Sequence, residues 1–192
     1  MTPTAGHYRF GPGSGRLLIR TTRAGLAAIA GHDLTLEVTR WSAVADVPAG
    51  DAGGPAAATI TAEADLGSLE VREGYGGAKP LTQADRADIE KTARRILTRG
   101  GDATATFRSS SVVPAAGGGG VIEGTFTLHG KTQPVRFQVT APSPGQYGGT
   151  GTVLQSAFGI KPYSAFFGAL KLADEVGVEF TVDLGRVAPE ST

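Results

Sequence analysis

The sequence predicts an all-β fold: a lipocalin-like, extended antiparallel β-barrel of about eight strands with one amphipathic α-helix. Most segments alternate apolar and polar residues with a period of two, Gly and Pro clusters separate these segments, and one segment has helical periodicity instead. Alternation directs one face of each strand to a core, and about eight strands are enough to close a small barrel. We therefore expect a single domain over residues 1–192, with its core at about 7–185.

Alternation is clear in the first half of the chain. Leu34, Leu36 and Val38 share one face of a short strand, and residues 41–47 alternate with the opposite parity. We expect a bulge or corner near Arg40 to reconcile the two segments. The other strands predicted in this half lie at residues 59–66 and 103–108 and, more weakly, near 7–10 and 16–22.

The stretch TFTLHGKTQPVRFQV, residues 125–139, contains two alternating runs joined by a short corner. We expect this corner, from His129 to Pro134, to be a hairpin connection in which Gly130 adopts unusual dihedral angles and Pro134 stiffens the start of the next strand. The remaining strands are predicted at residues 151–158 and 176–184, and hairpin tips at the Gly and Pro clusters 48–56, 114–120 and 141–151.

One segment, TQADRADIEKTARRILTRGG at residues 82–101, has apolar residues at helical spacing. The narrow apolar stripe consists of Ile89, Ala93, Ile96 and Leu97. Thr82, with Asp85 three residues later, is expected to cap the start of an amphipathic helix, and Gly100 and Gly101 are expected to end it. The stripe must cover an apolar surface, so we expect the helix at an open end or flank of the sheet.

Composition argues against several functions. The 18 basic and 18 acidic residues cancel, which disfavours nucleic-acid binding. The absence of Cys excludes disulfides, thiolate catalysis and cysteine-based metal sites. No segment approaches the roughly 20 apolar residues that cross a bilayer, and the first residues show no basic leader followed by an apolar run. We therefore expect a soluble, cytoplasmic protein.

Three histidines, His7, His32 and His129, are the candidates for metal binding or catalysis. None lies at the helical spacing of a metal motif, and we expect no metal, no cofactor and no catalytic residues. His32 and Asp33 are adjacent, so a carboxylate could orient an imidazole. Polar residues before a strand also commonly satisfy backbone groups at a turn, and this role is the preferred interpretation. An enzyme that uses His32, Asp33 and His129 is the less favoured alternative.

The apolar faces of the strands are the remaining candidate site. Large residues such as Phe107 and Phe180 occur on strands that also carry small residues such as Ala62, Ala105 and Gly124. This mixture fits a hollow barrel that holds one elongated apolar ligand, and it fits a tightly packed interior equally well. Periodicity alone does not separate these two interpretations.

Four longer motifs follow one another along the chain. They are YRFGPGSGRLLIRTTRAGLAAIAGHDLTLEVTRWSAVADV, ATATFRSSSVV, VIEGTFTLHGKTQPVRFQV and SAFGIKPYSAFFGALKLADEVGVEFTVDL, from about Tyr8 to Leu184. The most specific part runs from Gly124 to Val135 and is similar to a G-x-F/L-T-L-H-G-x-T-x-P-V hairpin. In these motifs the chain resembles the YceI-like lipid/polyisoprenoid-binding family. The resemblance implies a lipocalin-like barrel whose interior holds an isoprenoid or related amphiphilic chain, with no catalytic constellation.

The resemblance further implies a non-enzymatic protein that binds, sequesters or carries an isoprenoid or other long-chain lipid. Phe166 and Phe167 are expected at the barrel mouth, because two adjacent residues of a strand cannot both point inward. The main alternative is a structural or stress-linked interaction protein with a packed barrel, and a free edge or exposed mouth would also allow a homodimer. The expected ligand-binding residues are Leu36, Val38, Ile60, Phe107, Phe126, Leu128, Phe137, Phe158, Phe166, Phe167 and Phe180.

Overall fold

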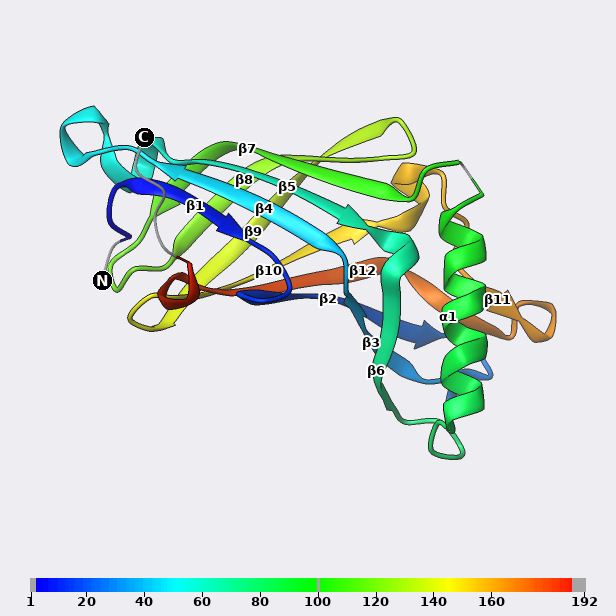
Figure 1. The fold of residues 1–192 in the computed structure, drawn as a ribbon. Coiled ribbons are helices and arrows are strands. Elements are labelled where there is room, and N and C mark those ends of the chain that lie inside the picture. Colours follow the sequence, from blue (N-terminus) through cyan, green and yellow to red (C-terminus); the bar gives the residue numbers. More distant parts are fainter. Residues whose placement is uncertain (1–2, 100, 188–192) are drawn as a thin grey trace.

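The structure, a computed structural model, describes residues 3–99 and 101–187. It consists of one strongly curled antiparallel sheet with a helix, α1 (Gln83–Leu97), across one end (Figure 1). The strands are β1 (Gly6–Phe10), β2 (Gly15–Ala24), β3 (Asp33–Val38), β4 (Trp41–Val47), β5 (Thr59–Asp65), β6 (Leu69–Tyr75), β7 (Thr104–Pro114), β8 (Gly120–Leu128), β9 (Lys131–Ser143), β10 (Gln146–Leu154), β11 (Ser164–Ala165) and β12 (Leu170–Asp183).

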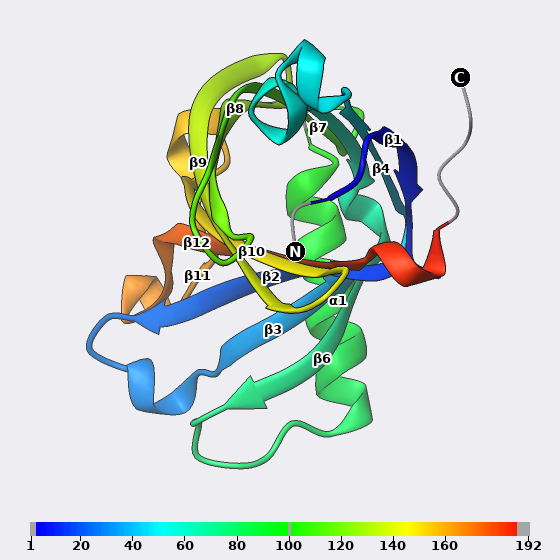
Figure 2. The same cartoon turned by 90° about the vertical axis from the view of Figure 1, so that its left-hand side faces the viewer.

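The sheet curls into a half-barrel. Its strand order is β1-β4-β5-β7-β8-β9-β10-β12-β2-β3-β6, with β11 beside β12, and no pairing among the described residues joins β1 to β6. Figure 2 shows β7, β8 and β9 arching over a lumen, while β2, β3 and β6 extend from it as a flap that α1 covers. The predicted all-β, lipocalin-like fold with one α-helix is confirmed, and the described residues form twelve strands where about eight were predicted.

Strand β6 was not predicted, because the alternation of its apolar and polar side chains breaks in the middle of the strand. Leu36 pairs with Val71 and Thr35 with Glu73, so Arg72 is an extra residue that bulges out of the ladder. A bulge shifts the side-chain alternation by one residue and removes the period-two signal. Strand β11 has only two residues, which is too short for any period to be visible.

Two corners explain why neighbouring segments change parity. At Thr39 and Arg40 the chain leaves β3 in the flap and continues as β4, which lies on the other side of the sheet order. The corner between β5 and β6 packs against it: Thr39 Oγ1 donates to Ser68 O at 2.9 Å, and an Arg40 guanidinium nitrogen lies 2.6 Å from Asp65 Oδ2. The predicted corner near Arg40 is therefore confirmed.

The hairpin between β8 and β9 is tighter than predicted. Leu128 pairs with Lys131, so only His129 and Gly130 form the turn, with φ values of 51° and 70°. Two consecutive positive φ values characterise a type I′ turn, whose twist matches that of the flanking strands. The unusual dihedral angles expected at Gly130 are present, but Pro134 lies inside β9 rather than in the connection.

Other predicted boundaries shift by a few residues. Strand β10 ends at Leu154, and Phe158 lies in a short 3-10 helix, η5 (Gln155–Phe158), rather than in a strand. The last Gly and Pro cluster supplies only a two-residue turn at 144–145, because the rest of it extends β9 and β10. The other two clusters join neighbouring antiparallel strands, as predicted.

Helix α1 begins at the predicted cap. Thr82 Oγ1 accepts a hydrogen bond from Asp85 N at 3.2 Å, and Asp85 Oδ2 accepts one from Thr82 N at 2.9 Å. This reciprocal pair is a capping box, which satisfies two backbone donors at the start of the helix. The helix ends at Leu97, and Gly101 follows with a φ of 104°, while Gly100 lies outside the described residues.

Helix α1 also protects the free edge of the sheet. Ile89 and Ile96 of its apolar stripe pack on a core cluster to which β3 and β6 contribute, as predicted. Beside the stripe, Glu90 Oε1 accepts from Val71 N at 2.8 Å, and Arg86 Nη1 donates to Val71 O at 3.1 Å. Helix side chains thus satisfy backbone groups of the edge strand β6, which hinders its pairing with another chain.

Ion pairs around Glu37 hold the three strands of the flap together on their outer face. Arg16 of β2 donates to both Glu37 carboxylate oxygens, at 3.2 and 3.1 Å, and Arg72 of β6 contacts Glu37 Oε2. Only 17% of the Glu37 side chain is exposed. Hydrogen bonds from Arg16, the largest cause, and from Arg72 lower the pKa of Glu37, although partial burial opposes them.

Glu37→Gln is expected to lower the free energy of unfolding by about 1 kcal/mol at neutral pH. Because folding lowers the pKa of Glu37, its carboxylate contributes fully above the unfolded pKa of about 4.3, and the contribution is lost as the pH falls through the folded value. Urea unfolding of both proteins from about pH 7 to about pH 3 measures this difference, which should shrink below about pH 4.3.

The exposed pair of Arg136 and Glu123 provides the matched control. Glu123→Gln should change the free energy of unfolding by less than about 0.5 kcal/mol at either pH. A Glu37→Gln effect that stays constant down to about pH 3 would contradict the assignment of the stabilisation to the ionised carboxylate.

Candidate functional site: two apolar cavities under the curled sheet

The first cavity, cavity 1, lies in the lumen of the half-barrel and has a volume of about 260 Å³. Its lining is almost wholly apolar and includes small side chains of β4 and β5 and aromatic side chains of β7, β9 and β12. Among the lining residues are Leu17, Trp41, Ala43, Ala45, Ile60, Ala62, Phe107, Phe137, Val178 and Phe180. Cavity 1 therefore suits an apolar ligand, because its lining offers few hydrogen-bond partners.

The second cavity, cavity 2, has a volume of about 390 Å³ and lies between helix α1 and the strands β2, β3 and β12. Ile89, Ala93 and Ile96 of the helix stripe form one wall. Its lining also contains polar residues: Thr21, Arg23, His32, Asp88, Thr92, Gln155, Tyr163 and Lys171. Cavity 2 is therefore amphipathic, whereas cavity 1 is apolar.

The two cavities adjoin through a thin layer of side chains. Ile19, Leu66, Phe126 and Val178 belong to both linings. Phe126 is the largest of these, and its ring meets that of Phe158 edge-on, with centroids 5.3 Å apart. We call these four side chains the partition.

Glycines let the aromatic rings of cavity 1 lie close to the backbone. A Cβ on Gly149 would lie 2.3 Å from Phe180 Cε1, and a Cβ on Gly124 would lie 2.6 Å from the Phe107 ring. The rings of Phe107, Phe137 and Phe180 follow one another edge to face, with centroids 5.5 and 5.6 Å apart. Because the rings occupy the space above glycines, the mixture of large and small residues leaves a cavity rather than a filled core.

Strand β2 runs past both cavities, and its inward side chains become more polar along the way. Leu17 lines cavity 1, Ile19 belongs to the partition, and Thr21 and Arg23 line cavity 2. At about 3.3 Å per residue, this row spans about 20 Å. The side chains of β2 therefore define an apolar end and a polar end of the site.

The hydroxyl of Thr21 has no partner. Thr21 is 9% exposed, and its Oγ1 is one of two buried side-chain polar atoms among the described residues that form no hydrogen bond, the other being His7 Nε2. Its cross-strand neighbours Leu34 and Val176 are apolar and line the same cavity. An unpaired buried hydroxyl costs about 1–3 kcal/mol, so such groups are normally hydrogen-bonded. Thr21 therefore places an unpaired hydroxyl in the wall of cavity 2, which a ligand oxygen would reach after rotation of the Thr21 side chain.

Most of the predicted ligand-binding residues meet at the cavities. Ile60, Phe107, Phe137 and Phe180 line cavity 1, Leu36, Leu128 and Phe158 line cavity 2, and Phe126 lines both. Val38 differs, because it is fully buried opposite Leu69 and lines neither cavity. Phe166 and Phe167 also line neither cavity, and both stand exposed to solvent. They lie in a short 3-10 turn with positive φ rather than in an extended strand.

The polar end of the site was missed from the sequence, although a signal was present. One face of the weakly predicted strand near residues 16–22, continued by one residue, carries Leu17, Ile19, Thr21 and Arg23. An apolar row that ends in a hydroxyl and a guanidinium is the pattern of an amphipathic binding surface. The hydroxyl's lack of a partner, in contrast, is visible only in three dimensions.

All three histidines and Asp33 have structural partners, and that of His7 is the Asp46 carboxylate, which its Nδ1 contacts. His129 Nε2 donates to a carbonyl of the last turn of α1 at 2.6 Å, which ties the β8–β9 hairpin to the helix. His32 Nε2 lies 2.8 Å from Lys79 O, whereas Asp33 accepts from Arg23 N at 2.8 Å. The two side chains therefore bind different backbone groups and do not pair with each other as a catalytic pair would.

In the described part of the chain, no three His, Asp or Glu side chains converge to hold a metal ion. None of the helices in residues 3–99 and 101–187 is long and apolar enough to cross a membrane.

A curled antiparallel sheet around apolar cavities defines a protein of the lipocalin-like class. The chain belongs to the YceI-like domain family, whose model matches residues 21–184. The predicted family is thus confirmed. A comparison with curated proteins gives no match.

Two solved structures are similar in fold. BcnA of Burkholderia cenocepacia is 17% identical, with a TM-score of 0.57 over 88% of this chain and 94% of BcnA. The YCEI protein of Campylobacter jejuni is 13% identical, with a TM-score of 0.52 over 82% of this chain and 85% of that protein. At these identities the likeness concerns the fold alone.

Proposed function

We propose that the protein binds one isoprenoid or similar amphiphilic lipid in cavities 1 and 2, and that it sequesters or carries this lipid without catalysing a reaction. The pair of apolar cavities that adjoin beneath one sheet is the observation that supports this most strongly. An elongated chain fits this shape better than a compact ligand does. The cavities also disfavour the alternative of an interaction protein with a packed barrel.

The cavity volumes suggest the length of the ligand. An apolar cavity of about 150 Å³ holds benzene, which corresponds to about 25 Å³ for each carbon. On this scale, about 260 Å³ holds about ten carbons and about 390 Å³ about fifteen, or two and three isoprene units. Each unit contributes roughly 3 to 4 kcal/mol before ordering costs, so three to five units support micromolar affinity or better.

The polarity of β2 suggests one orientation for the ligand. An oxygen of the ligand's head group beside Thr21 Oγ1 would give this buried hydroxyl its missing hydrogen bond. Arg23 already has partners, because its Nη1 donates to Gly31 O at 2.7 Å and its Nε lies 3.9 Å from Asp33 Oδ1. We therefore propose an uncharged head group, such as a hydroxyl or carbonyl, at Thr21, with the apolar tail directed past the partition toward cavity 1.

Thr21→Val is expected to weaken the binding of farnesol, a three-unit alcohol, by about five- to tenfold, because one buried hydrogen bond is lost. It should leave the binding of farnesene, a hydrocarbon of the same length, unchanged. The free protein should become more stable by about 1 kcal/mol, since an unpaired buried hydroxyl is removed. Competition with a fluorescent apolar probe measures both affinities, and urea unfolding measures the stability.

Thr22→Val is the matched control, because Thr22 is exposed on the opposite face of the same strand. It should change neither affinity. Equal losses of farnesol and farnesene binding in Thr21→Val would mean that the cavity wall, and not a hydrogen bond, is affected. The proposed orientation would then be incorrect.

The binding function itself is tested by extracting the purified protein with organic solvent and identifying the extract by mass spectrometry. We expect an isoprenoid with an oxygen-containing head group, in an amount that approaches one molecule per chain. An extract without lipid, together with no thermal shift when isoprenoid alcohols or quinones are added, would contradict the proposal.

A further inference from the structure

Four large apolar side chains stand in solvent at the end of the molecule where cavity 2 lies. Leu26, Ile29, Phe166 and Phe167 each expose at least 67% of their surface, and we call them the apolar tip. They come from two loops, one between β2 and β3 and one between β11 and β12. A hydrogen bond of 2.9 Å from Ala27 N to Ala169 O joins these loops, so the four side chains form one surface.

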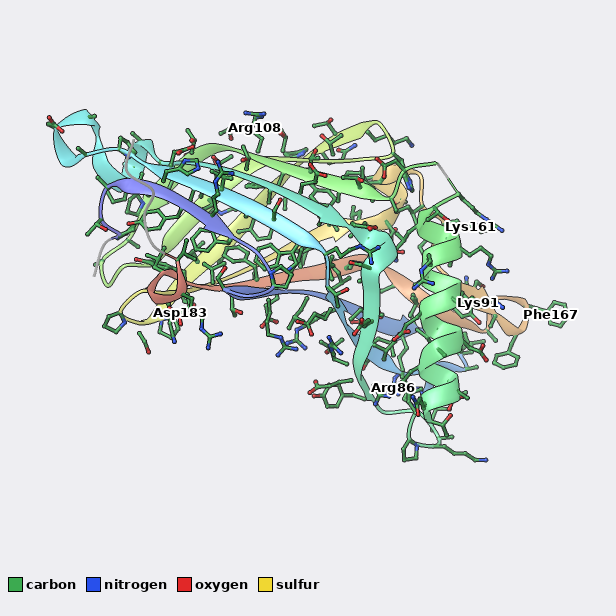
Figure 3. All side chains as sticks on the ribbon, in the orientation of Figure 1. Arg86, Lys91, Arg108, Lys161, Phe167 and Asp183 are labelled. Atoms are coloured by element: carbon green, nitrogen blue, oxygen red, sulfur yellow. The ribbon has the colours of Figure 1, made fainter. Side chains whose placement is uncertain are left out.

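The backbone of the second loop turns both aromatic rings outward. Phe166 and Phe167 have φ values of 50° and 53°, and two consecutive bulky residues in this region are uncommon because of the clash at Cβ. Figure 3 shows Phe167 at the extreme end of the molecule, pointing away from the sheet. Strained backbone conformations occur mostly at functional sites. Here the strained conformation keeps two aromatic rings in solvent that would otherwise pack in the core.

The apolar tip adjoins the polar end of the ligand site. Ala30 of the β2–β3 loop lines cavity 2, as do Tyr163, which directly precedes β11, and Leu170, which directly follows the β11–β12 loop. An exposed lysine, Lys171, borders the tip: it pairs with Ser164 across β11 and β12, and its Cε would lie 3.3 Å from a Cβ built on Gly168 of the second loop. Apolar side chains bordered by a lysine are the composition of surfaces that enter the interface of anionic membranes.

We propose that the apolar tip docks on a lipid bilayer, so that cavity 2 opens at the membrane surface. The tip is small and protrudes, whereas a stable interface with another protein covers about 800 Å² on each partner. A bilayer accepts separate protruding aromatic side chains without a matching groove, and Lys171 beside the tip would meet anionic head groups. The proposal requires only the exposed loops, so it stands independently of the ligand.

Co-sedimentation with phospholipid vesicles tests the docking. The probes are vesicles of phosphatidylcholine alone and vesicles in which about one third of the lipid is phosphatidylglycerol. The wild-type protein should bind both, and it should bind the anionic vesicles several-fold more tightly. The double substitution Phe166→Asn and Phe167→Asn should lower the partition coefficient at least about tenfold on both vesicles.

Asparagine is chosen because it tolerates positive φ, so the variant should keep its melting temperature and its affinity for farnesol. Leu154→Asn is the control, because Leu154 is an exposed apolar residue that lies outside the tip and lines neither cavity, and this variant should bind vesicles like the wild type. The proposal would be overturned if the wild type stayed in the supernatant with both vesicles, or if the double variant bound as well as the wild type. A wild-type dimer that the double variant dissociates, without vesicle binding, would assign the tip to self-association instead.

Discussion

Ala62→Phe is expected to weaken the binding of a five-unit isoprenoid alcohol at least about 100-fold and to leave the affinity for farnesol nearly unchanged. Ala62 lines cavity 1, opposite Phe107 in the pairing of β5 with β7, and a phenyl ring there fills much of the volume of about 260 Å³. A ligand with three units fits within cavity 2, whereas the last two units of a longer ligand need cavity 1. Those two units contribute roughly 6 to 8 kcal/mol before ordering costs, so a loss of 100-fold, about 2.7 kcal/mol, is a conservative expectation.

The control for this substitution adds the same ring to the outside of the sheet. Thr61 precedes Ala62 in β5 and therefore points to the opposite face. Thr61→Phe should leave both affinities unchanged, and circular dichroism should show that both variants keep the fold. An Ala62→Phe variant that binds the five-unit alcohol like the wild type would mean that the long ligand does not use cavity 1.

Phe126→Ala is expected to have the second-largest effect, because it opens the partition. Phe126 is the largest side chain that both cavities share, and its removal joins them into one space. The lost edge-to-face contact with Phe158 and the enlarged cavity should lower the free energy of unfolding by about 3 kcal/mol. At the same time, the five-unit alcohol should bind faster, because no aromatic ring has to move before the tail enters cavity 1.

Phe158→Ala separates these two effects. Phe158 is 2% exposed and belongs to the same aromatic pair, but it lines only cavity 2. Its removal should cost about 3 to 5 kcal/mol of stability without joining the cavities. Urea unfolding and stopped-flow binding of the five-unit alcohol measure the two quantities. If both variants accelerated binding equally, general loosening of the core, and not the partition, would explain the effect.

The sequence predicted the regular parts of this fold because they obey a single periodicity. Strand β12 alternates through Val176, Val178 and Phe180, and α1 has both an apolar stripe and a capping box. Strand β6 was missed because the extra residue Arg72 breaks its alternation. The half-barrel was not predicted either, because the contacts of Glu90 and Arg86 with the β6 edge depend on tertiary structure.

The kinds of residue that line the candidate site could be predicted from the sequence, but its division into two cavities could not. The inward parity of Phe107, Phe137 and Phe180 identified an apolar lining, and these side chains do line cavity 1. Whether this lining encloses a cavity depends on aromatic rings lying over glycines of neighbouring strands. That placement is set by the pairing register of the strands, which the sequence does not show. The exposure of Phe166 and Phe167 depends on positive φ values that no apolar pattern reveals.

Binding of a series of isoprenoid alcohols of two to eight units tests the central claim most directly. Titration by competition with a fluorescent probe should show an affinity that increases with each added unit up to about five, where both cavities are full, and does not increase beyond that length. An affinity that levels off at the same length for Ala62→Phe and the wild type, or no binding of any member of the series, would contradict the assignment of the two cavities to one lipid chain.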